Sequence, residues 1–171
     1  MSVFLSMLFV FIILQRITEL IIAKRNEKWM LAKGGIEIEP QQHKWFIVVH
    51  SLFFLSIFIE IVITKSTAVP TLFTLWFSLF ILTQFLRIWS ISSLGKHWNT
   101  KIIILPGSTL VKRGPYKYIK HPNYIIVGIE LFVIPMMFGA YWTAIIFPFL
   151  HLILMSIRIP AEEKALTSLN D

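Results

Sequence analysis

The stretch YIIVGIELFVIPMMFGAYWTAIIFPFLHLILMSIRI, residues 124–159, holds two apolar runs separated only by Gly139 and Ala140. The first run, residues 124–138, contains Pro135, which removes a backbone donor and kinks or ends a helix. The second run, residues 141–159, is about long enough to cross a bilayer. Because backbone groups in a bilayer must be paired internally, the stretch predicts a tight helical hairpin that enters and leaves a membrane.

The rest of the chain shares this apolar character. Of its 171 residues, 56% are hydrophobic and 15% are charged, which is far from the balance of a soluble domain. Three more apolar runs, residues 3–23, 45–64 and 70–91, are each about as long as a bilayer crossing. We therefore expect one domain, residues 1–171, with an all-α integral membrane fold of five transmembrane helices.

The basic residues are distributed unevenly between the two sides of the expected spans. Residues 24–44 hold five lysines and arginines and residues 92–121 hold six, whereas the opposite side has Lys65 alone. By the positive-inside rule, both basic segments face the cytoplasm and the N-terminus lies outside. Topology thus explains the net charge of +7, and we expect no nucleic acid partner. Without cysteines, and with histidines that lack ligand spacing, we expect no metal site.

Several ionisable residues fall inside the expected spans, where each should have a partner or a task. Arg16 and Glu19 have the i, i+3 spacing of a local ion pair on a helix. Glu19, Arg87 and Glu130 lie one to two turns from the cytoplasmic ends of their spans, next to Arg158 at the boundary. For Arg87 and Glu130, bracing of helices and contact with a ligand are both open.

Two other polar residues in the spans are expected to have structural roles only. Glu60 lies near the outer end of its span, where its carboxylate can extend to water. His50 lies in the middle of the same span and is expected to form a hydrogen bond between helices.

The run TLVKRGPYKYIKHPNY, residues 109–124, offers hydroxyl groups, flat aromatic rings and two proline-containing turns directly before an apolar span. Such a segment can form a polar pocket for a ligand with a heteroaromatic ring and a charged tail. Asn123 is expected to cap the following helix. The alternative is an aromatic belt at the membrane surface. Further on, RIPAEEKAL places Arg158 and Glu162 on one face if the helix passes Pro160.

GPYKYIKHPNY, Glu130 and RIPAEEKAL together resemble the isoprenylcysteine carboxyl methyltransferase family of integral-membrane enzymes, and most closely its small bacterial members, some of which methylate alkylpyrones. QRITELIIAKRN and LRIWSISSLGKHW extend the resemblance over most of the chain. It implies a bacterial plasma membrane protein with an S-adenosylmethionine site facing the cytoplasm. The implied cofactor residues are Lys101, Ser108, Thr109, Leu110, Val111, Tyr116, His121, Pro122, Asn123, Tyr124, Glu162 and Glu163. The implied catalytic residues are Arg158, Glu130 and Arg87.

The resemblance implies methyl transfer to a lipophilic acceptor with an acidic oxygen, such as an alkylpyrone enol or an isoprenylcysteine-like carboxylate. This acceptor would enter from the bilayer, whose lipids are the other expected partners. Three alternatives remain: a phospholipid N-methyltransferase, a steroid-type NADPH-dependent reductase, and a non-catalytic lipid-binding protein. A cationic or neutral amine acceptor would fit poorly beside Arg158, and a nicotinamide dinucleotide would need more room than the short loops offer.

Overall fold

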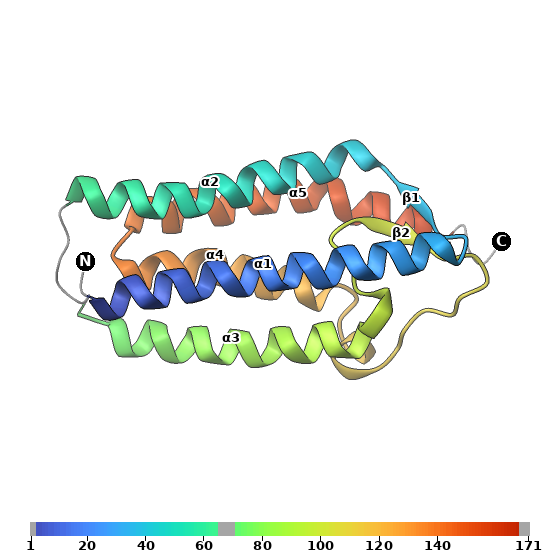
Figure 1. Cartoon of the computed structure of the whole chain (residues 1–171), viewed down its shortest axis with the longest axis horizontal. Helices are drawn as coiled ribbons and strands as arrows, with labels where there is room; N and C mark the ends of the chain where they lie inside the picture. The colour runs from blue at the N-terminus through green and yellow to red at the C-terminus, as the bar shows by residue number, and fades with distance from the viewer. Residues whose placement is uncertain (1–2, 65–70, 168–171) are drawn as a thin grey trace.

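Five helices lie side by side along the long axis of the molecule (Figure 1). The computed structural model describes residues 3–64 and 71–167, apart from the side chain of Gln42. The helices are α1 (Val3–Ala32), α2 (Pro40–Thr64), α3 (Phe73–Leu94), α4 (Pro122–Phe138) and α5 (Tyr141–Thr167). All but α4 are long and apolar enough to cross a membrane, whereas α4 has 17 residues. The chain is thus a helical membrane protein, and a fifth crossing through α4 stays a prediction.

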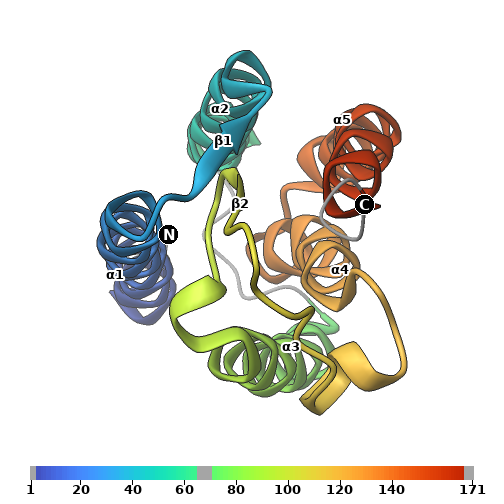
Figure 2. The ribbon, with the colours of Figure 1, turned by 90° about the vertical axis from the view of Figure 1, so that its right-hand side faces the viewer.

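The helices are arranged as a ring with α4 near the middle (Figure 2). α4 packs between α3 and α5, α2 packs against α5, and α1 lies on the side of the bundle away from α5. The tight connection between α4 and α5 makes the last two helices antiparallel, as the sequence predicts. The start of α4 therefore lies beside the end of α5.

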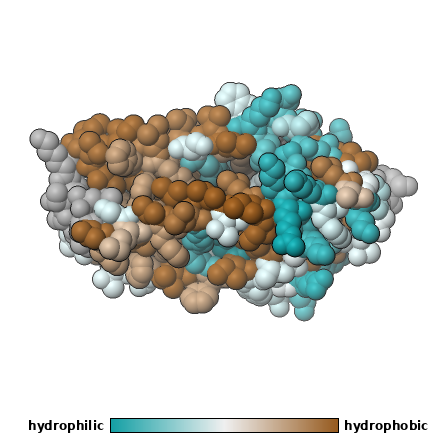
Figure 3. Space-filling view, viewed as in Figure 1, coloured by the Kyte–Doolittle hydropathy of each residue, from teal (hydrophilic) through white to brown (hydrophobic). Residues whose placement is uncertain are grey.

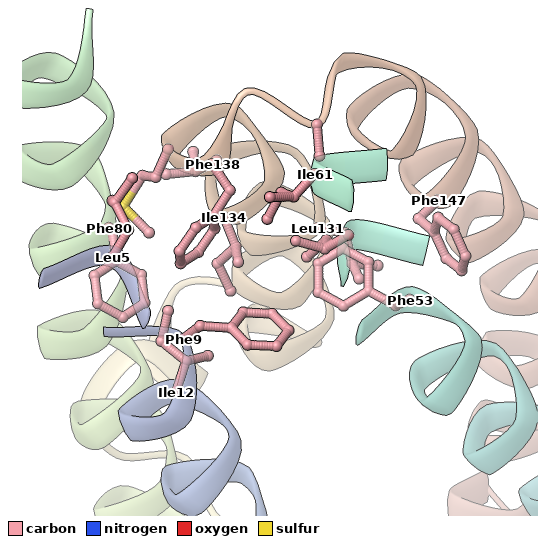
Figure 4. Close-up of a cluster of buried hydrophobic side chains, with 14 residues drawn as sticks. Leu5, Phe9, Ile12, Phe53, Ile61, Phe80, Leu131, Ile134, Phe138 and Phe147 are labelled. Carbon is pink, nitrogen blue, oxygen red and sulfur yellow. The ribbon is translucent and has the colours of Figure 1, made fainter. Parts of the chain in front are cut away.

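The hydrophobic core lies in the half of the bundle away from the long loops. Figure 4 shows its side chains, which come from all five helices. Edge-to-face aromatic pairs join α1 to α4 and α2 to α5, with ring centres 5.4 Å apart for both Phe9–Phe138 and Phe53–Phe147. Many large apolar side chains also lie on the outside, and Figure 3 shows them over most of the bundle, with hydrophilic residues gathered toward the loop end. Such a surface suits lipid better than water.

Three helices extend beyond the expected spans at the loop end by five residues or more. α1 continues to Ala32, α2 begins at Pro40 and α5 passes Pro160 to reach Thr167. The third expected span was to begin at Pro70, which lies outside the described residues, as does Lys65.

The two ends of α4 differ in detail from the prediction. His121 precedes the helix and Pro122 is its first residue, so the expectation that Asn123 is the N-cap was wrong. A proline is well suited to this position because its fixed φ matches the helix and its missing N–H would have no helical partner. Pro135 does not end α4, which runs on to Phe138. Gly139, at φ 70°, terminates it, and the next N–H, of Ala140, bonds back to the Pro135 carbonyl at 2.9 Å.

A small sheet, which the all-α prediction missed, joins two loops. Strands β1 (Ile36–Ile38) and β2 (Ile102–Ile104) pair antiparallel, with Glu37 opposite Ile103. The ammonium of Lys101 lies 2.9 Å from Glu27 of α1 and 3.1 Å from Glu37 of β1. Two short 3-10 helices, η1 (Gly95–His97) and η2 (Gly114–Lys117), complete the loop end.

Candidate active site

Four charged side chains form a buried network between α1, α3 and α4. Arg87 donates hydrogen bonds to Glu19 at 2.7 Å and to Glu130 at 2.8 Å. Arg16 lies 3.0 Å from each of the same two carboxylates, so its predicted pairing with Glu19 is confirmed. Arg87 is 8% exposed and Glu130 is 3% exposed. The charges of the two arginines and the two glutamates cancel, and the contacts between them hold α1, α3 and α4 together.

A second cluster lies around Arg158 on α5. Its Nε donates to the Tyr124 hydroxyl at 2.8 Å and its Nη2 donates to the Thr100 carbonyl at 2.8 Å. The guanidinium also lies 4.7 Å from the centre of the Phe46 ring, within the range of a cation–π contact. The Tyr124 hydroxyl donates in turn to Glu162, so tyrosine bridges the expected i, i+4 pair.

The hairpin explains why these residues meet. Tyr124 lies in the first turn of α4, and the antiparallel path places that turn beside the last turns of α5. Arg158 and Glu162 are one turn apart on α5 and share its face toward α4. The hairpin thus brings together Tyr124 and Glu162, two of the residues that the resemblance implies for the cofactor.

Three cavities meet at this cluster. The first, which we call the bundle cavity, has a volume of about 330 Å³ and lies among α1, α2, α4 and α5. The second, the loop cavity, has about 450 Å³ and lies between the long loop and the end of α5. The third, the junction cavity, has about 100 Å³ and shares Tyr124 and Arg158 with the bundle cavity and Tyr116 and Glu162 with the loop cavity.

The residues proposed for the cofactor mostly line the loop end of this system. The loop cavity is lined by Ser108, Thr109, Leu110, Val111, Tyr116, His121, Glu162 and Glu163. The junction cavity adds Lys101, Asn123 and Tyr124. Pro122 is buried in the first turn of α4 and lines none of the three cavities.

The three residues proposed for catalysis are separated. Arg158 lines the bundle and junction cavities, and Arg87 lines the bundle cavity. Glu130 lines none of the three, because both of its oxygens face the charged network and Gln84. Arg158 therefore has access to a ligand, whereas Glu130 is placed to hold helices together.

Polar side chains of the loop cavity interact with one another. The ring of His121 stacks on Tyr124 with centres 5.4 Å apart, and its Nε2 lies 3.4 Å from Glu163. The ammonium of Lys120 lies 3.2 Å from Glu163. Burial, and then the charge of Glu162, raise the pKa of Tyr116 above its ordinary value, so its hydroxyl remains a hydrogen-bond donor.

Sequence reasoning missed several residues of the bundle cavity. Phe46 and Thr100 contact Arg158, and His43 and His151 line the same cavity. Among these four residues only His151 carried a signal, since a polar residue within an apolar run needs a reason, whereas His43 lies in the polar segment PQQHK. The contacts of Phe46 and Thr100 depend on how distant elements pack.

The fold and the cavities define a helical membrane protein in which a polar cavity among the loops meets a largely apolar cavity inside the bundle. The sequence model of the isoprenylcysteine carboxyl methyltransferase (ICMT) family matches residues 74–168, and the chain belongs to this family of integral-membrane methyltransferases.

Two bacterial relatives match nearly the whole chain. The uncharacterized protein YpbQ of Bacillus subtilis (strain 168) is 40% identical over 161 residues, which are 94% of this chain and 95% of the relative. An uncharacterized protein of Haemophilus influenzae (strain ATCC 51907 / DSM 11121 / KW20 / Rd) is 29% identical over 167 residues, 97% of this chain and 96% of the relative. No solved structure matches the chain.

Proposed function

We propose that this protein is an S-adenosylmethionine-dependent O-methyltransferase whose acceptor is a lipophilic molecule with an acidic oxygen. The loop cavity holds the cofactor, and the bundle cavity receives the acceptor from the bilayer. The observation that carries the proposal is the chain of contacts from Arg158 through Tyr124 to Glu162, because it lies where the two cavities meet.

The residues of the loop cavity fit a cofactor of this kind. Carboxylates such as Glu162 and Glu163 accept hydrogen bonds from hydroxyl and ammonium groups, which the sugar and amino acid parts of the cofactor carry. In the adjoining junction cavity, the buried Oδ1 of Asn123 has no hydrogen-bond partner within the described part of the chain, which leaves one more acceptor. When bound, S-adenosylmethionine supplies an electrophilic methyl group on a sulfonium.

The chain's own residues position the acceptor. Hydrogen bonds to Tyr124 and Thr100 fix the guanidinium of Arg158, which has five N–H donors in all. In the described structure these two bonds leave other N–H groups of Arg158 for an acceptor oxygen. Charge complementarity and alignment then lower the barrier, because an ionised oxygen needs no further activation.

We infer the orientation of the protein in the membrane from the uneven distribution of its basic residues. The loop end of the bundle, with the cofactor cavity, faces the cytoplasm, and the N-terminus lies outside.

A phospholipid N-methyltransferase is a weaker alternative, because its amine acceptor would meet the cation of Arg158. A steroid-type reductase is weaker still, because the loop cavity of about 450 Å³ offers little room for a dinucleotide.

The test uses purified protein in detergent. We expect S-adenosylhomocysteine to raise the thermal unfolding midpoint, since a ligand that binds only the folded state stabilises it. Arg158→Ala should keep this shift but lose methyl transfer by about 100-fold or more, the size of effect seen when an oxyanion-binding donor is removed. Arg113→Ala is the matched control, because Arg113 is exposed and lines none of the three cavities. The proposal fails if S-adenosylhomocysteine stabilises neither protein.

A further inference from the structure

Buried polar atoms without hydrogen-bond partners collect around the bundle cavity. Within residues 3–64 and 71–167, they are Nδ1 of His43, Nε1 of Trp98, Nδ2 of Asn99, Oδ1 of Asn123 and Nδ1 of His151. In folded proteins nearly all such atoms are paired with protein or with something bound. The cavity is lined by apolar side chains and by charged ones such as Arg158, so with these atoms it suits a ligand with a polar head and an apolar tail.

His43 lines this cavity together with Arg158, and Arg158 is one of the charged groups that act on its imidazole. The imidazole of His43 interacts with the backbone of Thr100, whose carbonyl accepts a hydrogen bond from Arg158 at 2.8 Å. Phe46, which stacks on the Arg158 guanidinium, is one turn from His43 on the same face of α2. An acceptor oxygen bound to Arg158 therefore lies beside His43.

The other two histidines of the cavity are placed differently. The Nδ1 of His50 is hydrogen-bonded to the Phe46 carbonyl at 2.8 Å. His151 bonds through Nε2 to the Tyr124 carbonyl at 3.0 Å, and it is seven residues from Arg158, about 10 Å along the helix. Both line the same cavity and serve as controls.

We propose that His43 is the general base of the reaction when the acceptor carries a protonated hydroxyl group, as an enol or a phenol does. This rests on the proposed function. The acceptor O–H bond breaks and its proton passes to Nδ1 of His43. The oxygen forms a bond to the methyl carbon while the bond from carbon to sulfur breaks, and its electron pair stays on sulfur as the thioether. The proton then leaves His43 for water.

The charged groups that surround His43 come from three elements. Arg158 faces it from α5, Lys101 from the segment before β2 and Glu27 from α1. An ionisation in the pH profile that disappears in His43→Gln, and not in variants of the other two histidines of the cavity, belongs to this imidazole.

The experiment compares 3-pentadecylphenol, which is protonated at neutral pH, with palmitate, which is already ionised. We expect His43→Gln to lower the turnover of the phenol by about 100-fold or more, the usual contribution of a general base. Turnover of palmitate should change less than about threefold, because an ionised acceptor gives up no proton. The variant should also lose the near-neutral ionisation in its pH profile, and added imidazole should restore activity to His43→Ala.

The control variants and the binding assay separate the possible failures. His50→Gln and His151→Gln should keep the pH profile, and all variants should keep the stabilisation by S-adenosylhomocysteine, which also shows that they fold. Two results would overturn the role of His43 and leave the proposed function standing. One is an equal loss of turnover on both acceptors in His43→Gln, and the other is loss of the ionisation in His151→Gln instead. Methylation of neither compound by a wild-type protein that still binds S-adenosylhomocysteine would overturn the acceptor class as well. Failure of that binding would overturn the proposed function itself.

Discussion

Removal of Arg87 tests whether the charged network braces the bundle. Arg87→Met removes hydrogen bonds of 2.7 Å to Glu19 and 2.8 Å to Glu130 and leaves two buried carboxylates with Arg16 as their cation. Breaking a buried ion pair from one side costs about 3–5 kcal/mol, because the remaining charge has lost its partner. For a chain of this size that loss lowers the thermal midpoint by on the order of 10 °C.

The double variant Arg87→Met/Glu130→Leu restores the charge balance, since Arg16 and Glu19 keep their contact of 3.0 Å. Replacing a whole buried pair with apolar side chains is often neutral, so we expect this protein to lie within about 1–2 kcal/mol of the wild type. Thermal unfolding in detergent at fixed lipid content measures the stability of the single and the double variant. A double variant as unstable as the single one would refute the reasoning. Lys120→Met, at a pair whose lysine side chain is 83% exposed, should change little and is the control.

Three further changes have definite expected results. Glu60→Ala removes a carboxylate that accepts two backbone N–H groups at the start of α5, each at 2.9 Å, and should lower the free energy of unfolding by about 1–2 kcal/mol, whereas Glu60→Gln should lose less. In Gly114→Ala the new Cβ would lie 2.0 Å from the Ser93 hydroxyl at a φ of +58°, so we expect a smaller stabilisation by S-adenosylhomocysteine than in Gly107→Ala, where only the backbone is strained. Hydrogen bonds, first with Glu27, raise the pKa of Lys101, so its contribution to stability is complete below the ordinary value of 10.5 and is lost as pH rises through the higher folded value. Unfolding midpoints of Lys101→Met should accordingly fall less steeply above pH 10.5 than those of the wild type, and parallel curves would contradict this account.

The apolar runs of the sequence predicted all five helices, because burial in lipid requires length and hydropathy above all. The predicted ends of these helices were less accurate. Hydropathy falls after Ala23, yet the following residues favour a helix and α1 continues to Ala32. The strands β1 and β2 have three residues each, too few to show a period of two, and their pairing depends on distant loops.

Contacts between helices were the hardest to predict. Glu60 was expected to extend to water; it is half-buried, and its oxygens also accept hydrogen bonds from the first turn of α5, which was not foreseen. His50 was expected to join two helices, but it bonds to a carbonyl of its own helix. The meeting of Tyr124 with Glu162 was predictable because a hairpin brings those ends together, whereas nothing in the sequence places α2, with Phe46, against Arg158.

The pairing of β1 with β2 limits where the molecule can be labelled. A tag inserted between α1 and α2 would break the register in which Glu37 faces Ile103, and the disturbance would reach Thr100 just upstream of β2. Because the Thr100 carbonyl accepts a hydrogen bond from Arg158, a probe in the first loop would disturb a side chain of the last helix. A spectroscopic label is better attached at Tyr118, whose side chain is 75% exposed.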